Sequence, residues 1–376
     1  MDWNEWRREF PIVERLVHLN HAGIAPLPRR VAAAVTTFAT EATTVDPATQ
    51  RRWSQRCEQV RASFAQLVGA RADEIAFVKN TSEGLSLVAA GVEWRAGDNV
   101  IAVDGEYPSN VYPWFALRRR GVETRLVHRV HGRVQVDNVR ALVDERTRLV
   151  AVSFVDWSSG ARTNLAALGD FCQAHGILFC VDGIQGVGAL RLDVERAAID
   201  CLAVGGHKWL LAPEGYGCLF VSRRVADRIG SVLHGWKSVT DPDTYLPYHF
   251  DPRPDAAKFE PGSPSVLSTY ALGAAIDLLL DVGPVQIERR LMELTDRLAA
   301  GLRARGAEII SPWGTDERSG IVVFRLGNDP QRLCADLIAK GFIVRVRSGG
   351  IRVAPHFYNN EDDVDRLLNS LERSSA

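Results

Sequence analysis

Short, nearly continuous apolar runs alternate with longer segments of helical character between residues 74 and 221. Such runs, rich in β-branched and aromatic residues, are typical of strands covered on both faces of a sheet. The predicted strands are Ile75–Lys79, Val100–Val103, Thr124–Val127, Leu149–Phe154, Ile177–Val181, Cys201–Gly205 and Gly217–Val221. Because strands and helices alternate, the pattern predicts an α/β fold with a mainly parallel sheet between helices.

Three of the intervening segments carry helix boundary signals. Ser82–Ala90 starts with a good N-cap residue, and Ser109–Arg119 ends in an arginine cluster, which suits the negative end of a helix dipole. Leu165–His175 is followed by a glycine, a frequent residue just beyond a helix C-terminus. Gly215 marks a turn, so the apolar run after it is predicted to be an antiparallel strand.

The second part of the chain has a different pattern. Two long helices are predicted at Ser265–Leu280 and Pro284–Arg305, and the remainder follows the order strand, helix, strand, strand, helix, which indicates a smaller α+β domain. The N-terminal helix is expected to pack on that smaller domain. The predicted division is a large domain of residues 20–283 and a small domain formed by residues 1–19 and 284–376.

Composition and charge exclude several classes of protein. The 376 residues include 45 Lys plus Arg against 46 Asp plus Glu, so a dominant surface for nucleic acid or anionic membrane is not expected. Charges interrupt the first twenty residues and every long apolar stretch, so neither a signal peptide nor a membrane span is predicted. Six scattered cysteines without a CxxC pair indicate free thiols, a cytoplasmic location and no metal site.

The most informative polar residues follow two of the predicted strands. Asp182 and Gln185 come after one apolar run, and His207 and Lys208 come after the next. Because ligands of an open α/β sheet bind at the carboxyl ends of its strands, these side chains are expected at one crevice. A lysine and an acid suit pyridoxal 5′-phosphate (PLP): the lysine binds the aldehyde covalently, and the acid keeps the pyridine nitrogen protonated. Gln185 is expected to hydrogen-bond the ring hydroxyl.

Each of these residues also has an ordinary structural interpretation. An aspartate before a glycine is most often a turn former, and an isolated Gly-His-Lys is most often on the surface. Their order, spacing and position after strands together favour the PLP site.

A further segment, Lys79-Asn-Thr-Ser-Glu-Gly84, joins a predicted strand to a predicted helix. Thr81 and Ser82 therefore lie at a helix N-terminus, which is suited to bind a phosphate. The competing interpretation is a capping box in which Thr81 or Ser82 only satisfies the first helical turn.

Seven landmarks, in order over nearly the whole chain, carry a resemblance to a known family. They are Leu19-Asn-His-Ala-Gly-Ile-Ala-Pro26, Asn80-Thr-Ser-Glu-Gly84, Glu106-Tyr-Pro-Ser-Asn110, Val181-Asp-Gly-Ile-Gln185, Gly206-His-Lys208, Phe259-Glu-Pro-Gly-Ser263 and Gly350-Ile-Arg-Val-Ala354. With them the chain resembles the class V aminotransferase/cysteine desulfurase family of fold-type I PLP-dependent enzymes, with some kynureninase-like features. The resemblance implies that fold, PLP as cofactor and a homodimer that shares its active site.

The resemblance also implies roles for individual residues. Lys208 and Asp182 are the implied catalytic residues. The implied cofactor contacts are Thr81, Ser82, Tyr107, Asp182, Gln185, His207, Lys208, Trp236 and, from the neighbouring subunit, Ser263. Tyr107 matches the residue that stacks on the cofactor ring, although Pro108 aligns in another register. Trp236 matches an indole that reaches the phosphate.

The implied substrate contacts are mostly near the C-terminus. Arg352 matches the arginine that forks onto the substrate α-carboxylate, a task that lysine does not perform equally well. Arg347 is a candidate for an acidic substrate side chain or for an internal ion pair, and His21 is expected to line the substrate mouth. Additional candidates for the pocket are the segment 156–160, Tyr245, Tyr248 and His249.

Two departures from the family pattern bear on the reaction. Persulfide-forming desulfurases have a cysteine before the carboxylate-binding arginine, but Val346–Ile351 has none, and Cys334 lies within a predicted helix. A persulfide-forming cysteine desulfurase is therefore not expected. Gly205 stands where the family often has a hydroxyl residue, which predicts a weaker phosphate contact.

The resulting prediction is an enzyme that acts at Cα of an amino acid or amine. The substrate amine displaces Lys208, and Lys208 then removes the Cα proton. We expect an aminotransferase; a C–S lyase acting by β-elimination and an amino-acid epimerase use the same lysine and acid and stay open. A PLP-fold binding module without catalysis is a remote possibility. So is a nicotinamide-dependent oxidoreductase, for which the glycine spacing after Asp182 is wrong.

Overall fold

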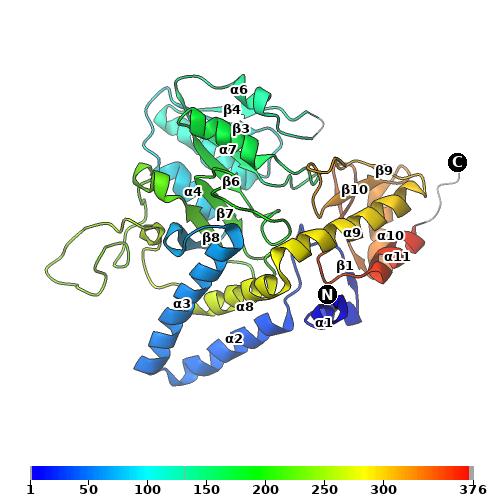
Figure 1. Ribbon diagram of the computed structural model, residues 1–376, viewed down its shortest axis with the longest axis horizontal. Coiled ribbons are helices and arrows are strands. Elements are labelled where there is room, and N and C mark those ends of the chain that lie inside the picture. The colour runs from blue at the N-terminus through cyan, green and yellow to red at the C-terminus, as the bar shows by residue number, and fades with distance from the viewer. Residues whose placement is uncertain (1, 131, 372–376) are drawn as a thin grey trace.

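A seven-stranded sheet forms the centre of the large part of the molecule (Figure 1). The computed structural model describes residues 2–130 and 132–371. The strands are β2 (Ile75–Val78), β3 (Asn99–Val103), β4 (Glu123–Val127), β5 (Thr147–Ser153), β6 (Leu178–Asp182), β7 (Cys201–Gly205) and β8 (Gly217–Val221). Their order is β2-β8-β7-β6-β5-β3-β4, and β8 runs antiparallel to both of its neighbours. The mainly parallel α/β sheet and the antiparallel last strand are confirmed.

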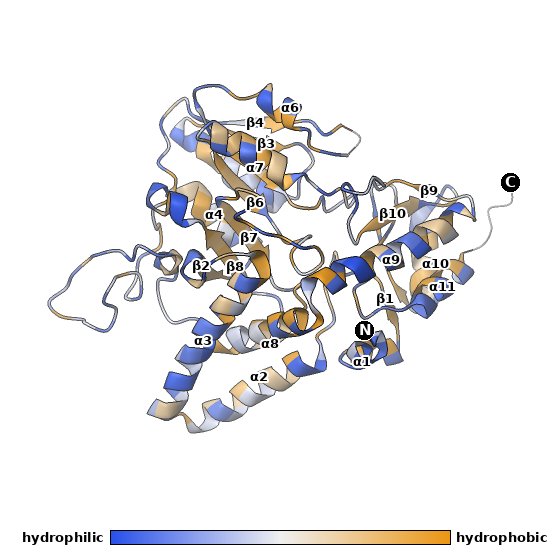
Figure 2. Ribbon diagram, viewed as in Figure 1, coloured by the Kyte–Doolittle hydropathy of each residue, from blue (hydrophilic) through white to orange (hydrophobic). Residues whose placement is uncertain are grey.

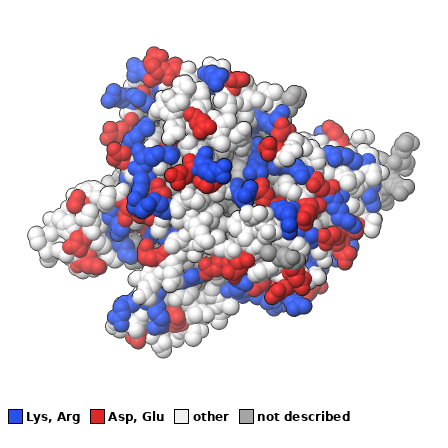
Figure 3. Space-filling view, viewed as in Figure 1, with Lys and Arg blue, Asp and Glu red and all other residues white. Residues whose placement is uncertain are grey.

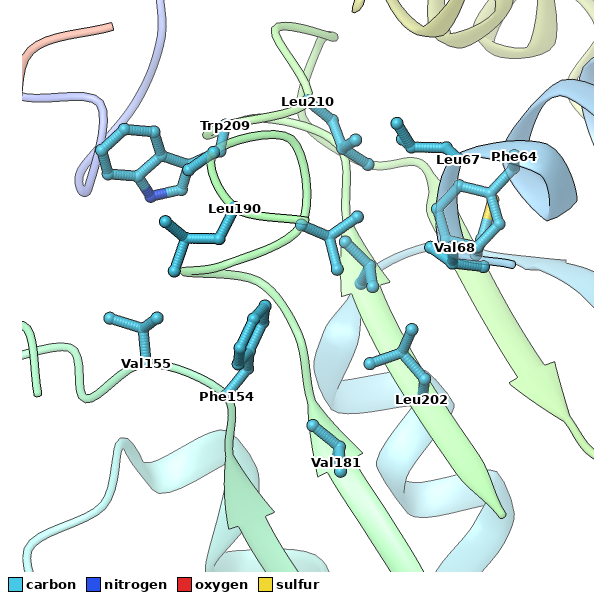
Figure 4. Close-up of a cluster of buried hydrophobic side chains, with 14 of the residues drawn as sticks. Phe64, Leu67, Val68, Phe154, Val155, Val181, Leu190, Leu202, Trp209 and Leu210 are labelled. Atoms are coloured by element: carbon cyan, nitrogen blue, oxygen red, sulfur yellow. The ribbon is translucent and has the colours of Figure 1, made fainter. Parts of the chain in front are cut away.

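Helices cover both faces of this sheet. They are α2 (Arg29–Glu41), α3 (Pro47–Val68), α4 (Thr81–Gly91), α5 (Tyr112–Ala116), α6 (Val136–Arg140), α7 (Leu165–Ala174) and α8 (Val266–Val282). Alternate strand residues belong to two separate apolar clusters, one shared with α4 and α5 and the other with α3, α7 and α8. In the second cluster, Phe64, Leu67 and Val68 of α3 lie on one side and Phe154 and Trp209 on the other (Figure 4).

Two regions of the sheet layer differ from the sequence prediction. The predicted helix Ser109–Arg119 is divided into a 3₁₀ turn (Pro108–Asn110), α5 and a second 3₁₀ turn (Leu117–Arg120). Pro113 lies inside the predicted helix and removes the backbone N–H that would bond to the carbonyl of Ser109, which explains why the helix is not continuous from Ser109. Helices α2 and α3 were not predicted from the sequence.

A second, antiparallel sheet lies beside the C-terminal helices. Its strands are β9 (Glu308–Ile309), β10 (Val322–Arg325), β12 (Arg345–Arg347) and β13 (Gly350–Val353), and the helices are α9 (Pro284–Arg303), α10 (Pro330–Ala339) and α11 (Glu361–Ser370). The N-terminal elements, α1 (Trp3–Arg7) and β1 (Val17–His18), contact this part: β1 pairs with β11 (Phe342–Ile343), and Arg7 forms an ion pair with Asp363 at 2.7 Å. The division at residues 20–283 stays a prediction.

Polarity follows the layers. The strands are largely apolar, whereas α3, α9 and α11 carry hydrophilic residues on their outer sides (Figure 2). On the face seen in Figure 3, basic and acidic side chains are intermixed. Among the described residues, no individual helix combines the length and apolarity needed to cross a membrane, although α8 and α9, bent by 77°, meet both criteria as a pair.

Candidate active site

A cavity of about 400 Å³ opens where β2, β6 and β7 end. Because β8 is the reversed strand, these three strands point the same way and bring their carboxyl ends to one rim. The cavity gathers nine predicted site residues: Thr81, Ser82, Tyr107, Asp182, Gln185, His207, Lys208, Arg347 and Arg352. Lining residues that sequence reasoning did not select are Ala22, Gly23, Asn80, Ser109, Ile184 and Glu214. The strand argument therefore predicted the position of the cavity correctly.

Asp182 is the last residue of β6 and is only 2% exposed. Its Oδ1 atom accepts a hydrogen bond from the backbone N–H of Ile184 at 3.0 Å. Burial raises the pKa of Asp182 to about 6, against the opposing effects of that hydrogen bond and of Lys208. A protonated ring nitrogen beside this carboxylate would give it a positively charged hydrogen-bond donor, which no side chain of the described residues provides.

Lys208 follows β7 and faces the same cavity. Burial lowers the pKa of Lys208 to about 8; Asp182 raises it, while Arg352 and Arg347 lower it further. Its Nζ atom lies 5.7 Å from the centre of the Tyr107 ring. A substantial fraction of this amine is therefore neutral near pH 8, as a nucleophile or base requires.

Gln185 is held at both ends of its amide. Its Nε2 donates to the carbonyl of Ala22 at 3.0 Å, and its Oε1 accepts from the indole N–H of Trp209 at 3.0 Å. One amide N–H and one oxygen lone pair remain for a ligand. The contact of Gln185 with a ring hydroxyl stays a prediction.

The N-terminus of α4 closes another side of the cavity. Asn80 caps the helix, because its side chain accepts from the N–H of Glu83 at 2.9 Å. The hydroxyls of Thr81 and Ser82 are therefore not used as the cap. Thr81 Oγ1 accepts from the N–H of Gly205 at 3.0 Å, and a β-carbon at residue 205 would lie 3.3 Å from that oxygen. Glycine at 205 thus leaves room for the Thr81 hydroxyl at an anion-binding helix end.

Ser82 and His207 complete this end. The Oγ atoms of Ser82 and Ser109 are hydrogen-bonded at 2.7 Å. Burial lowers the pKa of His207, and Lys208 lowers it further, while Glu214 raises it. A neutral imidazole keeps one N–H to donate to a phosphate oxygen.

Two arginines on the hairpin β12–β13 form the opposite side. Arg352 is 2% exposed; its Nη1 donates to the carbonyl of Trp157 at 2.7 Å and its Nη2 to Asn20 Oδ1 at 3.2 Å, but its buried Nε has no partner. Burial, followed by the charge of Arg347, lowers the pKa of Arg352 to about 10. Within the described part of the chain, Arg352 forms no ion pair with a carboxylate, so a bound anion would complete its surroundings.

An aromatic wall joins these two sides. Tyr107 and Trp157 pack edge to face with ring centres 5.6 Å apart, and the guanidinium of Arg347 lies 5.7 Å from the Trp157 ring centre. Of the additional pocket candidates, the segment 156–160 therefore contributes Trp157. Tyr245, Tyr248 and His249 are exposed and lie outside the cavity.

His21 corrects one prediction, because its side chain does not line the cavity. It is fully buried: Nδ1 donates to the carbonyl of Ala354 at 2.8 Å, and Nε2 accepts from the Tyr358 hydroxyl at 2.9 Å. The next residue, Ala22, reaches the cavity instead. The physical reason is that the C-terminal segment satisfies both ring nitrogens of His21 inside the protein.

Trp236 and Ser263 are not in the cavity of their own chain. Both line a separate cavity of about 930 Å³, and the contact of Trp236 with the phosphate stays a prediction. Ser263 was predicted to act from a neighbouring subunit, and that prediction and the homodimer stay untested.

None of the six cysteines is among the lining residues of the cavity. All six are buried, and the thiol of Cys334 on α10 lies 3.8 Å from the carbonyl of Val344. Only Ser348 and Gly349 connect β12 to β13, and both have positive φ (50° and 73°), as a tight two-residue turn requires. No thiol lines this cavity among the residues that the structure describes.

The fold and this cavity together define a PLP-dependent enzyme of fold type I. Residues 17–367 match the family model Aminotransferase class-V, and the chain belongs to this family. It is 31% identical to a probable cysteine desulfurase of Methanothermobacter thermautotrophicus over 97% of this chain and 96% of that protein. It is 28% identical to the uncharacterized aminotransferase C777.03c of Schizosaccharomyces pombe over 98% and 95% of the two chains.

A solved structure of similar fold holds the cofactor. A variant of C-DES, with glycine covalently linked to its PLP, superimposes with a TM-score of 0.90 at 22% identity, over 96% of this chain and 98% of that one. The predicted family, fold, cofactor and enzyme class are confirmed. The relatives' names support neither the expectation of an aminotransferase nor the exclusion of a desulfurase. Cytoplasmic location and a homodimer stay predictions.

The residues present fit PLP. Asp182 would pair with the ring nitrogen, Lys208 with the aldehyde, and the N-terminus of α4, with the hydroxyls of Thr81 and Ser82, would hold the phosphate. The amine, the acid and the helix end all line the same cavity, and the buried carboxylate has no hydrogen bond from a cationic side chain among the described residues.

Proposed function

We propose that this chain is an aminotransferase in which Lys208 removes the Cα proton of an α-amino acid. The observation that carries the proposal is the position of Lys208: its amine lies in the cavity between Asp182, the aromatic wall and two arginines, and burial lowers its pKa to about 8. An amine with this pKa can hold a proton and release it near neutral pH.

The remaining residues of the cavity bind and orient. Asp182 would hold a proton on the ring nitrogen, and the N-terminus of α4 with Thr81, Ser82 and His207 would hold the phosphate. Arg352 would bind the α-carboxylate through its unused N–H groups and so direct the Cα–H bond toward Lys208. When bound, PLP supplies an electron sink for the charge that develops at Cα.

Transfer of the amino group needs few groups beyond these. Lys208 would hold the proton removed from Cα, and its flexible side chain would let this one residue deliver the proton to the second position that transamination requires. A route that forms a persulfide on the protein itself needs a protein thiol, and the lining residues described above include none. These points support transamination over a persulfide-forming reaction.

The second candidate is a C–S lyase that releases sulfide without a protein thiol. It is supported by the names of relatives such as the probable cysteine desulfurase of M. thermautotrophicus. In that reaction Lys208 also takes the Cα proton, and the Cβ–S bond then breaks. Water finally converts the remaining amino acrylate to pyruvate and ammonia.

One experiment separates these reactions. The holoenzyme is incubated in D₂O with a panel of amino acids, and Cα–H exchange, oxo acid, sulfide and enantiomers are measured. An aminotransferase forms at most one equivalent of oxo acid per active site until a 2-oxo acid acceptor is added. Repeated turnover to sulfide and pyruvate without an acceptor would establish the lyase, and inversion at Cα would establish an epimerase. Absence of Cα exchange with every amino acid overturns the proposal.

A further inference from the structure

Arg347 and Arg352 point to the same side of one hairpin. Arg345 pairs with Arg352 and Arg347 pairs with Gly350 across β12 and β13, so Arg347 and Arg352 are diagonal neighbours on one face. Diagonal positions of this kind have β-carbons about 7 Å apart. Both side chains line the cavity that contains Lys208. This spacing is wide enough for two separate anionic groups of one small molecule.

The acidic residues of the cavity lining, Asp182 and Glu214, form no ion pair with these arginines among the described residues. Neither arginine forms an ion pair within the described residues. Asp156 is the nearby acid, but its Oδ1 accepts four hydrogen bonds from the backbone and hydroxyl groups of Ser158 and Ser159, and its Oδ2 accepts from Arg129. The carboxylate of Asp156 is therefore already engaged, and two guanidinium charges remain for a ligand.

Arg347 presents an unused binding fork. Its Nη1 donates to the carbonyl of Val346 at 2.8 Å, while its buried Nε has no partner in the structure. The guanidinium lies over the indole of Trp157, which fixes its plane without using its N–H groups. The N–H groups of Nη1 and Nη2 that no protein acceptor uses remain for the two oxygens of a carboxylate. Arg347 is thus oriented for a planar anion in the cavity.

We infer that the substrate is an α-amino acid with a second carboxylate on its side chain, bound by Arg347 on the Trp157 platform. The inference rests on the proposed function, because it assigns the α-carboxylate to Arg352. When the α-carboxylate of the substrate pairs with Arg352, the guanidinium of Arg347 still has no negatively charged partner. An aminodicarboxylate supplies that charge, whereas a substrate with an apolar side chain leaves Arg347 uncompensated.

Calorimetry of the holoenzyme with two non-reacting ligands tests this specificity. 2-Methylaspartate and 2-aminoisobutyrate both lack a Cα hydrogen, so each binds without turnover, and only the former has a second carboxylate. Wild-type protein is expected to bind 2-methylaspartate at least about tenfold more tightly. In Arg347→Gln the dissociation constant of 2-methylaspartate should rise about tenfold or more, while that of 2-aminoisobutyrate should change less than about twofold.

Two further variants complete the experiment. Arg332→Gln removes an equal charge from an exposed residue of α10 and should leave both constants unchanged. Arg347→Lys keeps the charge but loses the fork, so its constant for 2-methylaspartate should lie between those of wild type and Arg347→Gln.

Two results overturn the inference. The first is equal binding of the two ligands by the wild type. The second is an equal loss for both ligands in Arg347→Gln, which would mean that Arg347 shares the α-carboxylate. Failure of the proposed function is distinct: Cα exchange would be absent for every amino acid, even where 2-methylaspartate binding depends on Arg347.

Discussion

Two buried polar clusters near Trp209 differ in whether their polar atoms have hydrogen-bond partners within the protein. The first, here called the histidine cluster, consists of His18, His21, His356 and Tyr358. In it, His21 uses both ring nitrogens, and His356 donates to the carbonyl of Trp209 at 3.1 Å and accepts from the N–H of Phe357 at 2.8 Å. Its rings pack within 4.7 to 6.4 Å of one another.

The second cluster is the cavity around Lys208. There, Arg347 and Arg352 each keep a buried Nε without a partner, and Asp182 is held beside a lysine amine in a poorly solvated site. Both clusters are rich in titratable groups, but only one lacks partners for them. The comparison shows that hydrogen-bond partners distinguish the two kinds of cluster. In a structural cluster the polar atoms have partners within the protein, whereas in a cluster arranged to bind a ligand some of them do not.

The largest expected effect concerns Lys208 and tests whether the unsatisfied cluster is the reacting one. Lys208→Ala should lower Cα–H exchange at least about 10³-fold, because no other lysine among the described residues lines the cavity. Exchange is followed by proton NMR in D₂O with PLP at saturation. Lys340→Ala, which removes an exposed lysine bonded to the carbonyl of Ser370 at 2.9 Å, is the matched control and should exchange normally. Comparable exchange in both variants would refute the role of Lys208.

The next effect concerns Arg352. Arg352→Gln should lower kcat/KM for the preferred amino acid about 10²-fold, because a charge-assisted fork to the α-carboxylate is lost. Steady-state kinetics of wild type, Arg352→Gln and Arg352→Lys measure this, and the lysine variant should recover only part of the loss. An unchanged kcat/KM in Arg352→Gln would place the α-carboxylate elsewhere.

Asp182 provides a test through stability rather than activity. Burial raises its pKa from 3.8 to about 6, so the ionised carboxylate costs folding free energy above pH 6, and this cost is absent below about pH 4. Asp182→Asn should therefore stabilise the PLP-free protein by about 2 kcal/mol at pH 8 and have little effect at pH 4. Thermal unfolding at the two pH values measures this.

The same substitution should have the opposite effect on the cofactor. PLP affinity should fall in Asp182→Asn, because the ring nitrogen loses its counter-charge. A variant less stable than wild type at pH 8 without PLP would show that the carboxylate is already compensated by the protein, against the contrast drawn above.

The smallest effect belongs to the histidine cluster. Burial lowers the pKa of His356 from 6.5 to about 4, so its neutral form supports the fold fully above pH 6.5, and that contribution is lost as the pH falls toward 4. His356→Gln should lower the free energy of unfolding by about 1 kcal/mol at pH 7. Between pH 6.5 and 4 it should also reduce the number of protons taken up on unfolding by about one, which makes stability less dependent on pH. Urea unfolding across this range measures both, and an unchanged dependence of stability on pH would contradict the prediction.

The sequence was most informative where a strand controls the position of a residue. Asp182 and Lys208 each follow an apolar strand, and the parallel arrangement alone predicts that they meet at one rim. The N-terminus of α4 was located for the same reason, since β2 ends at that rim.

The remaining features depend on tertiary packing. His21 lies next to Ala22, which lines the cavity, but only the pairing with Ala354 determines that the imidazole is buried on the other side. Trp157 was one of several pocket candidates, and its contact with Arg347 arises from residues 190 positions apart. The predicted helix Ser109–Arg119 is interrupted near Pro113, and the sequence pattern did not predict this because local patterns indicate the ends of helices poorly.

The two-residue turn at Ser348 and Gly349 has an evolutionary consequence. It sets the pairing of Arg347 with Gly350, and therefore the side of the hairpin from which Arg347 emerges. Because strand side chains alternate, a change of pairing by one residue would move Arg347 to the opposite face, away from the substrate. Under the inference that Arg347 binds the second carboxylate, preference for a particular amino acid would depend on the length of a turn as well as on a side chain, and a one-residue insertion or deletion there would change it.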